Sequence, residues 1–248
     1  MKKIKFSFFA LLLVGAMACN KSDKSTSANV SGSITTDDAA DMVAGSLSAN
    51  SNGLANVSAD ATLDATTYVN AHVGCGTAKS DTISRHNSGS NWSYSYQLTY
   101  NYVVNCVNNV PDNLSSNLTY SGNFSGPNMT STNSGTSDFT VGGLAPGSNT
   151  FVINGEYKRS GSFASKIDTT HNGNSNIDIN VSALTLTRPG RVIASGTATF
   201  SISGTSKKGS FSFTGTVVFN GDGTAKVTIN GTVYTINLTT GVRVKISG

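Results

Sequence analysis

Residues 91–106 read NWSYSYQLTYNYVVNC, and aromatic or aliphatic side chains alternate with polar ones along the stretch. A period of two residues predicts a β-strand with one buried face. Fully extended, the stretch would span about 50 Å, well beyond a usual strand, so it must twist or bend strongly. The apolar face comprises the even positions: Trp92, Tyr94, Tyr96, Leu98, Tyr100, Tyr102, Val104 and Cys106.

The same alternation continues through most of the chain after about residue 64 and predicts about a dozen strands joined by short loops. At Asn230-Gly231 the inward set changes from odd positions (Val227) to even ones (Tyr234), as a two-residue hairpin turn requires. A similar change after Val181 predicts a β-bulge near residues 182–183. The expected fold is mainly β, an antiparallel meander forming a barrel or a strongly curved sheet. A β-sandwich is the alternative.

One helix is expected at residues 36–49, packed on the sheet. Thr35 and Asp38 form a capping-box-like start, and Asn52-Gly53 supplies a stop signal. A stripe at the helical period lies between them: Ala39, Met42, Val43, Ser46 and Leu47. We therefore expect a single β-rich domain over residues 35–248 that begins with this helix.

A turn at residues 87–90 would pair residues 75–86 antiparallel with residues 91–106. If Ile83 faces Leu98, Cys75 lies opposite Cys106, within disulfide reach. A metal site with His72 and His86 is the alternative, but these histidines lack a zinc-finger spacing. The same register sets three further pairs: Lys79 with Tyr102, Asp81 with Tyr100, and Arg85 with Tyr96.

These six residues are the candidate ligand-binding face, because cations over tyrosine rings beside a carboxylate can hold a polar ring such as a sugar. The alternative is an edge strand whose inward charges discourage aggregation, with the tyrosines in the core. The outward rows of Ser, Thr and Asn could also meet glycans. No catalytic motif is found, His171 stands in a turn-like context, and Glu156 is expected to form an exposed ion pair with Lys158. No metal or cofactor is expected.

The N-terminus has the order of a secretory signal: Lys2, Lys3 and Lys5, an apolar run over residues 6–14, and Ala16-Met17-Ala18 before Cys19. Residues 1–24 resemble the signal of a Bacteroidetes-type bacterial lipoprotein. The resemblance implies removal of residues 1–18, lipidation of Cys19, a flexible tether over residues 19–34 and attachment to the outer membrane. Without residues 1–18 the chain holds 14 basic and 13 acidic residues, so its charge gives no reason to expect a nucleic-acid partner.

The sequence therefore favours a non-catalytic, membrane-anchored lipoprotein that acts as a surface binding or adhesion module, with a glycan as the candidate ligand. A periplasmic or surface carrier that encloses an apolar small molecule within the curved sheet is the alternative. An enzyme of unknown class is the second alternative. A carrier requires a continuous internal cavity, whereas a filled core favours adhesion.

Overall fold

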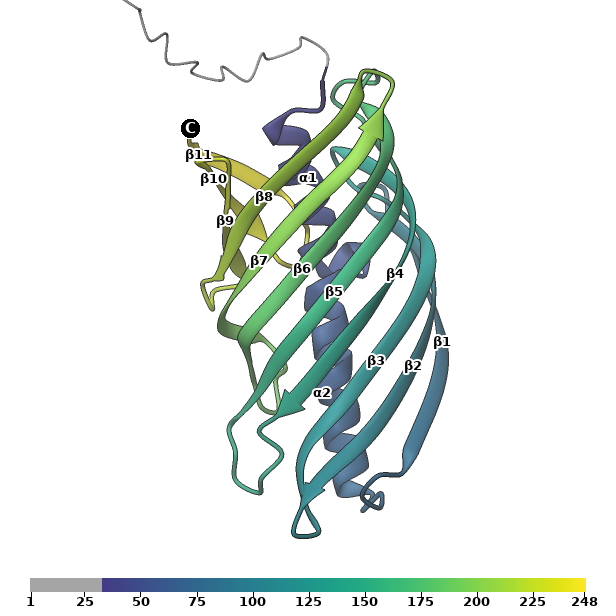
Figure 1. Cartoon of the computed structure of the whole chain (residues 1–248), viewed down its shortest axis with the longest axis vertical. Coiled ribbons are helices and arrows are strands. Elements are labelled where there is room, and N and C mark those ends of the chain that lie inside the picture. The colour runs from purple at the N-terminus through teal and green to yellow at the C-terminus, as the bar shows by residue number, and fades with distance from the viewer. Residues whose placement is uncertain (1–32) are drawn as a thin grey trace, which may run out of the picture. The chain divides into compact units, whose positions relative to one another are not determined.

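Eleven antiparallel strands form one continuous sheet, in which each strand pairs with its neighbours in the chain (Figure 1). The computed structural model describes residues 33–248. This arrangement confirms the predicted antiparallel meander. The strands are β1 (Ala78–Ser88), β2 (Ser93–Val107), β3 (Val110–Ser125), β4 (Met129–Gly142), β5 (Thr150–Ser165), β6 (Asn172–Thr187), β7 (Ile193–Ser206), β8 (Gly209–Phe219), β9 (Thr224–Ile229), β10 (Thr232–Asn237) and β11 (Arg243–Ser247).

The sheet is strongly curved but not closed, because β1 and β11 form its two edges in the described range. Figure 1 shows the strands bending around two helices. At one end the turns come together around the indole of Trp92. A Cβ atom on Gly126 would lie 2.7 Å from that ring, and one on Gly241 would lie 3.0 Å from it. Trp92 thus packs against the turn after β3 and the turn after β10, and only glycine fits at those two positions without displacing it.

The helices are α1 (Thr36–Leu47), the 3₁₀-helix η1 (Ala49–Ser51) and α2 (Leu54–Asn70). The predicted helix at 36–49 therefore ends two residues earlier, and the expectation of one helix was wrong. The inward face of α2 comprises Leu54, Val57, Ser58, Ala61, Thr62 and Ala65, which follow the helical period but are mostly small. Small side chains let the helix approach the sheet closely. Within residues 33–248, no helix is long and apolar enough to cross a membrane.

Helix α1 is buried from Asp38 to Leu47, because it contacts β9, β10 and β11 and also meets the concave face of the sheet. Its start has the predicted capping box. The Thr35 hydroxyl accepts the N–H of Asp38 at 3.1 Å, and the Asp38 carboxylate accepts the N–H of Thr35 at 2.8 Å. Arg243 of β11 reaches the Asp41 carboxylate at 2.7 Å. These polar contacts hold the first turns of α1 and join the helix to β11.

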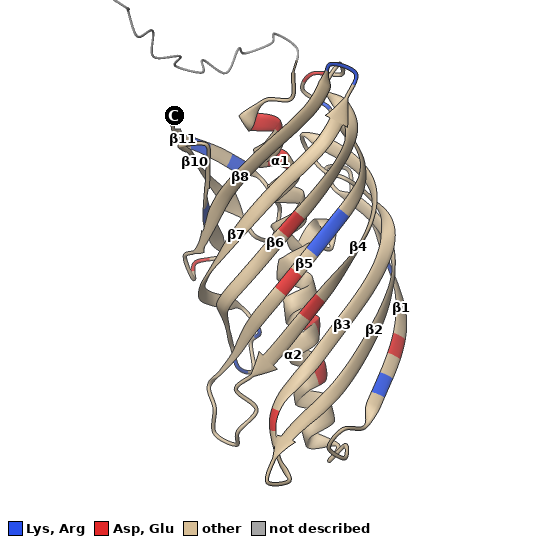
Figure 2. Ribbon diagram, in the orientation of Figure 1, with Lys and Arg blue, Asp and Glu red and all other residues tan. Residues whose placement is uncertain are grey.

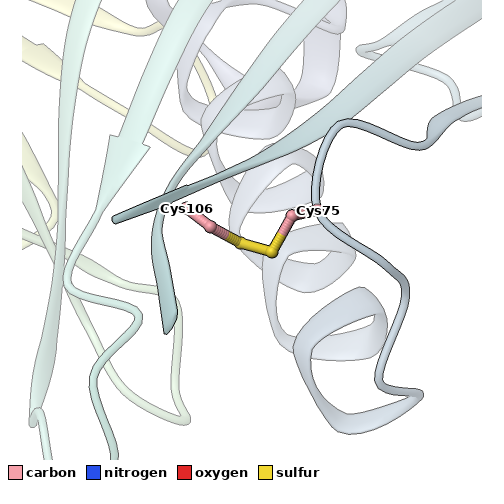
Figure 3. The surroundings of a disulfide bond; sticks show 2 residues. All are labelled: Cys75 and Cys106. Atoms are coloured by element: carbon pink, nitrogen blue, oxygen red, sulfur yellow. A yellow bond between two sulfur atoms is a disulfide. The ribbon is translucent and has the colours of Figure 1, made fainter. Parts of the chain in front are cut away.

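The pairing of β1 with β2 follows the predicted register, with Ile83 opposite Leu98 and Asp81 opposite Tyr100. Cys75 and Cys106 form the predicted disulfide, with Cα atoms 5.7 Å apart (Figure 3). Cys75 itself precedes β1, so the disulfide lies just beyond the paired segment. The predicted lipidation site and signal, and most of the tether, lie outside the described residues.

Candidate functional site

The tyrosine row proposed from the sequence as a binding face lies inside the molecule, against α2. Tyr96, Tyr100 and Tyr102 are each only 2% exposed. The Tyr100 hydroxyl donates a hydrogen bond to the Asp60 carboxylate at 2.5 Å, and the Tyr102 hydroxyl donates one to Asp64. Helix α2 thus occupies the face that a ligand was expected to fill.

The two carboxylates match the two tyrosines because of the geometry of the elements. Residues 60 and 64 are one helical turn apart, a rise of about 6 Å. Tyr100 and Tyr102 are alternate residues of a strand, about 6.6 Å apart. Helix α2 can therefore run along β2 with its carboxylates in step with the phenol hydroxyls.

The charged members of the predicted face are divided between this interface and the sheet edge. Arg85 donates two hydrogen bonds, both 2.7 Å, to the two carboxylate oxygens of Asp60. Lys79 and Asp81 are exposed on the edge strand β1. Tyr96 bonds instead to the side chain of Asn133, at 3.1 Å from its amide nitrogen. The structure therefore unites Arg85 and Tyr100 at one carboxylate and leaves Lys79 and Asp81 at the rim.

Burial sets the protonation of this interface. It raises the pKa of Asp64, a rise that the Tyr102 hydrogen bond opposes and the negative charge of Asp60 reinforces. Burial and the neighbouring carboxylates also raise the pKa of both Tyr100 and Tyr102 far above the ordinary value. The phenols consequently remain protonated and act as donors.

A second polar cluster surrounds Arg159, which is 3% exposed. Its guanidinium donates hydrogen bonds to the carbonyl oxygens of Gly45 at 2.6 Å and Ser51 at 3.1 Å. The guanidinium carbon lies 5.4 Å from the centre of the Phe124 ring and 5.8 Å from that of Tyr157. Arg159 thus satisfies carbonyl groups at the end of α1 and in η1, the negative end of the helix dipole.

The space between α1 and the sheet is filled. A cavity beside Arg159 and another beside Trp92 each hold about 10 Å³, room for about one water molecule. The large internal cavity that the carrier hypothesis requires is not found between these elements of the described range.

A broad concavity of about 1010 Å³ lies on the outer face of the sheet, over β4 to β8. It surrounds the bulge predicted from the sequence. Between Val181 and Leu184, β6 has one residue more than the facing segment of β5. The bulge residue Ala183 has a left-handed backbone (φ 49°), and its N–H is held by the Asn154 side chain at 2.8 Å. We call this broad depression the outer groove.

Polar side chains cross the outer groove in one row, because strand pairing aligns one outward residue from each strand. Asp138 faces Glu156, and Glu156 faces Asn180. The row continues with Thr199 and Thr216. The groove thus presents carboxylate, amide and hydroxyl groups side by side on a rigid sheet.

Carboxylates gather at the β4–β6 end of the outer groove, which Asp138 and Glu156 line. Figure 2 marks acidic segments on these neighbouring strands. Lys158 forms the predicted ion pair with Glu156 at 2.6 Å, but Asp138 and Asp178 add two further negative charges on neighbouring strands. Burial, then the hydrogen bond and negative charge of Glu156, raise the pKa of Asp178. The groove therefore disfavours anionic ligands.

His171 is buried and closes a turn with Asp168, whose carbonyl accepts its N–H at 2.9 Å. The turn that the sequence suggested over residues 172–174 is instead the start of β6. The His171 Nδ1 lies 2.8 Å from the Asp38 carboxylate, so the histidine links the start of β6 to the capped end of α1. Within residues 33–248, no group of three or more His, Cys, Asp or Glu residues is arranged to hold a metal ion.

The outward Ser, Thr and Asn rows and the bulge were each predictable from the sequence, but their combination into one site was not. The outer groove needs both, because the bulge creates the depression that the polar rows line. No protein-family model matches the chain, and neither a curated protein nor a solved structure matches it.

Proposed function

We propose that the protein is a non-catalytic lipoprotein, anchored in the outer membrane through Cys19, whose outer groove binds neutral glycans at the cell surface. The observation that carries the proposal is the outer groove itself, a concavity of about 1010 Å³ crossed by aligned carboxylate, amide and hydroxyl groups. The anchor is supported by the lipoprotein-like order of residues 1–24.

The groups in the groove suit a polyhydroxylated ligand. The carboxylates of Asp138 and Glu156 accept hydrogen bonds from sugar hydroxyls, and the amide of Asn180 both donates and accepts. The threonines add hydroxyls together with methyl groups that can meet the apolar faces of sugar rings. Strand pairing fixes the spacing of these groups, so little ordering is needed on binding.

The negative charge of the groove predicts selectivity among glycans. Acidic polysaccharides would bring carboxylate or sulfate groups against Asp138 and Glu156, at an electrostatic cost. Neutral glycans carry no such cost. We therefore expect uncharged oligosaccharides to bind and acidic ones to be rejected.

The test is a screen of immobilised neutral and acidic oligosaccharides with the purified full chain, followed by variants. A double change, Asp138→Ala with Asn180→Ala, removes two groups of the row and should weaken binding about tenfold or more. Asn176→Ala is the matched control, since Asn176 is exposed on the same strand outside the lining. Failure of every neutral glycan to bind, or equal losses in both variants, would contradict the proposal.

A further inference from the structure

A separate cavity of about 220 Å³ lies where α2 begins, between that helix and three turns of the sheet. Ala55 and Ala59 of α2 form one wall. Val192 and Ile193 at the start of β7 and Leu238 after β10 provide apolar side chains around it. Two alanines on one helix face leave space that a longer side chain would fill.

The cavity has one cationic group, Arg191. Its side chain is half-buried and forms no ion pair with another residue of the described range. The nearby Arg188, in contrast, is engaged, because it lies 5.1 Å from the centre of the Phe151 ring and bonds to the Gly143 carbonyl at 3.2 Å. Arg191 is therefore the free cation at this cavity.

The backbone holds Arg191 in place. The Arg191 N–H donates to the Thr187 carbonyl at 2.7 Å, and the Thr187 N–H donates to the Val192 carbonyl at 2.8 Å. Arg191 also adopts a left-handed conformation with φ 52°, which costs energy for a residue with a side chain. The turn thus fixes the base of a charged side chain at the rim of an apolar cavity.

The acidic residues adjacent in sequence to the cavity already have partners. Asp60 binds Arg85 and Tyr100 on another face of α2. Asp222, which precedes the cavity residue Gly223, accepts the Thr224 hydroxyl at 2.6 Å. Neither carboxylate pairs with Arg191, so its charge is available to an anion.

We propose that this cavity binds a short-chain aliphatic carboxylate, with its alkyl chain between α2 and Ile193 and its carboxylate on Arg191. The volume is below the range of about 300–1,000 Å³ typical of drug-sized ligands, which limits the chain to a few carbon atoms. The site is distinct from the outer groove, and the inference does not depend on glycan binding.

The test compares hexanoate with hexan-1-ol, which has the same chain length without the charge. Each is titrated into the isotopically labelled full chain, and amide shifts of Ala55, Ala59, Ile193 and Gly223 are followed by NMR. Both compounds should move these signals, with hexanoate bound more tightly.

The Arg191→Gln variant should bind hexanoate about tenfold more weakly and hexan-1-ol with unchanged affinity. The matched control Lys207→Gln removes a charge from an exposed turn and should change neither affinity. Ala59→Leu should abolish the binding of both compounds, because the leucine side chain fills the cavity. Thr67→Leu, on the exposed side of α2, should leave the binding of both unchanged. The inference fails if hexanoate leaves these amides unmoved. It also fails if hexanoate binds Arg191→Gln as well as wild type, or if both compounds still bind Ala59→Leu.

Discussion

Arg159 shows how a single residue holds the concave side of the sheet to the helices. Its charge is buried, with two backbone carbonyl groups and three aromatic rings around it. Burial opposes the charge, but the tyrosines around it raise the pKa of Arg159 above its ordinary value. This role of Arg159 was not predictable from the sequence, because an arginine beside Lys158 is typical of a solvated strand.

Arg159→Met should lower the free energy of unfolding by about 2–4 kcal/mol, because the carbonyls of Gly45 and Ser51 would lose their donors in the core. Urea denaturation measures the change. Lys158→Met is the matched control at the neighbouring, outward position, and it should alter stability by about 0.5 kcal/mol or less. Equal effects of the two substitutions would contradict the assigned role.

Asp64 should make stability depend on pH. Because its pKa in the folded protein is raised above the ordinary 3.8, the folded state binds the proton more tightly than the unfolded state. Its contribution is complete below pH 3.8 and is lost as the pH rises through the raised folded pKa. Asp64→Asn should remove this fall in the free energy of unfolding.

Urea denaturation of wild type and Asp64→Asn between about pH 3 and pH 7 tests the effect, since the difference isolates one carboxyl group. The Asp112→Asn variant, altered at an exposed residue of β3, serves as control. A difference between wild type and Asp64→Asn that stays constant over the whole range would argue against the burial of Asp64 as its cause.

Among the secondary-structure elements, the strands could be predicted from the sequence and α2 could not. The strands have Val, Ile, Tyr and Phe at alternate positions, so their period is visible and even the bulge near Ala183 could be placed. Helix α2 buries small residues such as Ser58 and Ala61, whose hydrophobic signal is weak, and it ends in Thr66, Thr67, Tyr68 and Val69, which favour strands. The helical spacing of these residues is visible in the sequence. The close packing of α2 on the sheet, which requires small residues, is not.

Because α2 was not predicted, the tyrosine face was considered both as a binding face and as part of the core, and the burial of Tyr96, Tyr100 and Tyr102 matches the second interpretation. The register of β1 with β2 was predicted correctly, with Arg85 opposite Tyr96. The packing of α2 against this face was not predicted. The carboxylates of Asp60 and Asp64 occupy the positions that were proposed for a ligand. Buried tyrosines and an accessible aromatic platform have the same alternating sequence pattern, and only the position of α2 distinguishes them.

The disulfide anchors β1, an edge strand that pairs on only one side within the described range. Replacing both Cys75 and Cys106 with alanine should lower the free energy of unfolding by about 3–4 kcal/mol, the chain-entropy value for a loop of this length. Thermal unfolding with and without a reductant measures it. Reductant should destabilise wild type and leave the double variant unchanged, and an unchanged wild type would count against the bridge.

In the whole described domain, the helices cover the concave side of the curved sheet, and its outer side stays exposed to solvent. The helices fill the interior, so the domain gains a core without needing to close the sheet. The outer surface, in turn, keeps long rows of polar residues at fixed spacing. For this reason the proposed glycan site is the outer groove, and neither the tyrosines nor the β1 edge.

The most direct measurement is NMR mapping of a neutral oligosaccharide that binds the full chain. We expect the amide shifts to centre on Asn154, Asn180 and Thr199, around the bulge on the outer face. Shifts centred on Tyr100 and Tyr102 in the interior, or on Lys79 and Asp81 at the β1 edge, would contradict the proposed site.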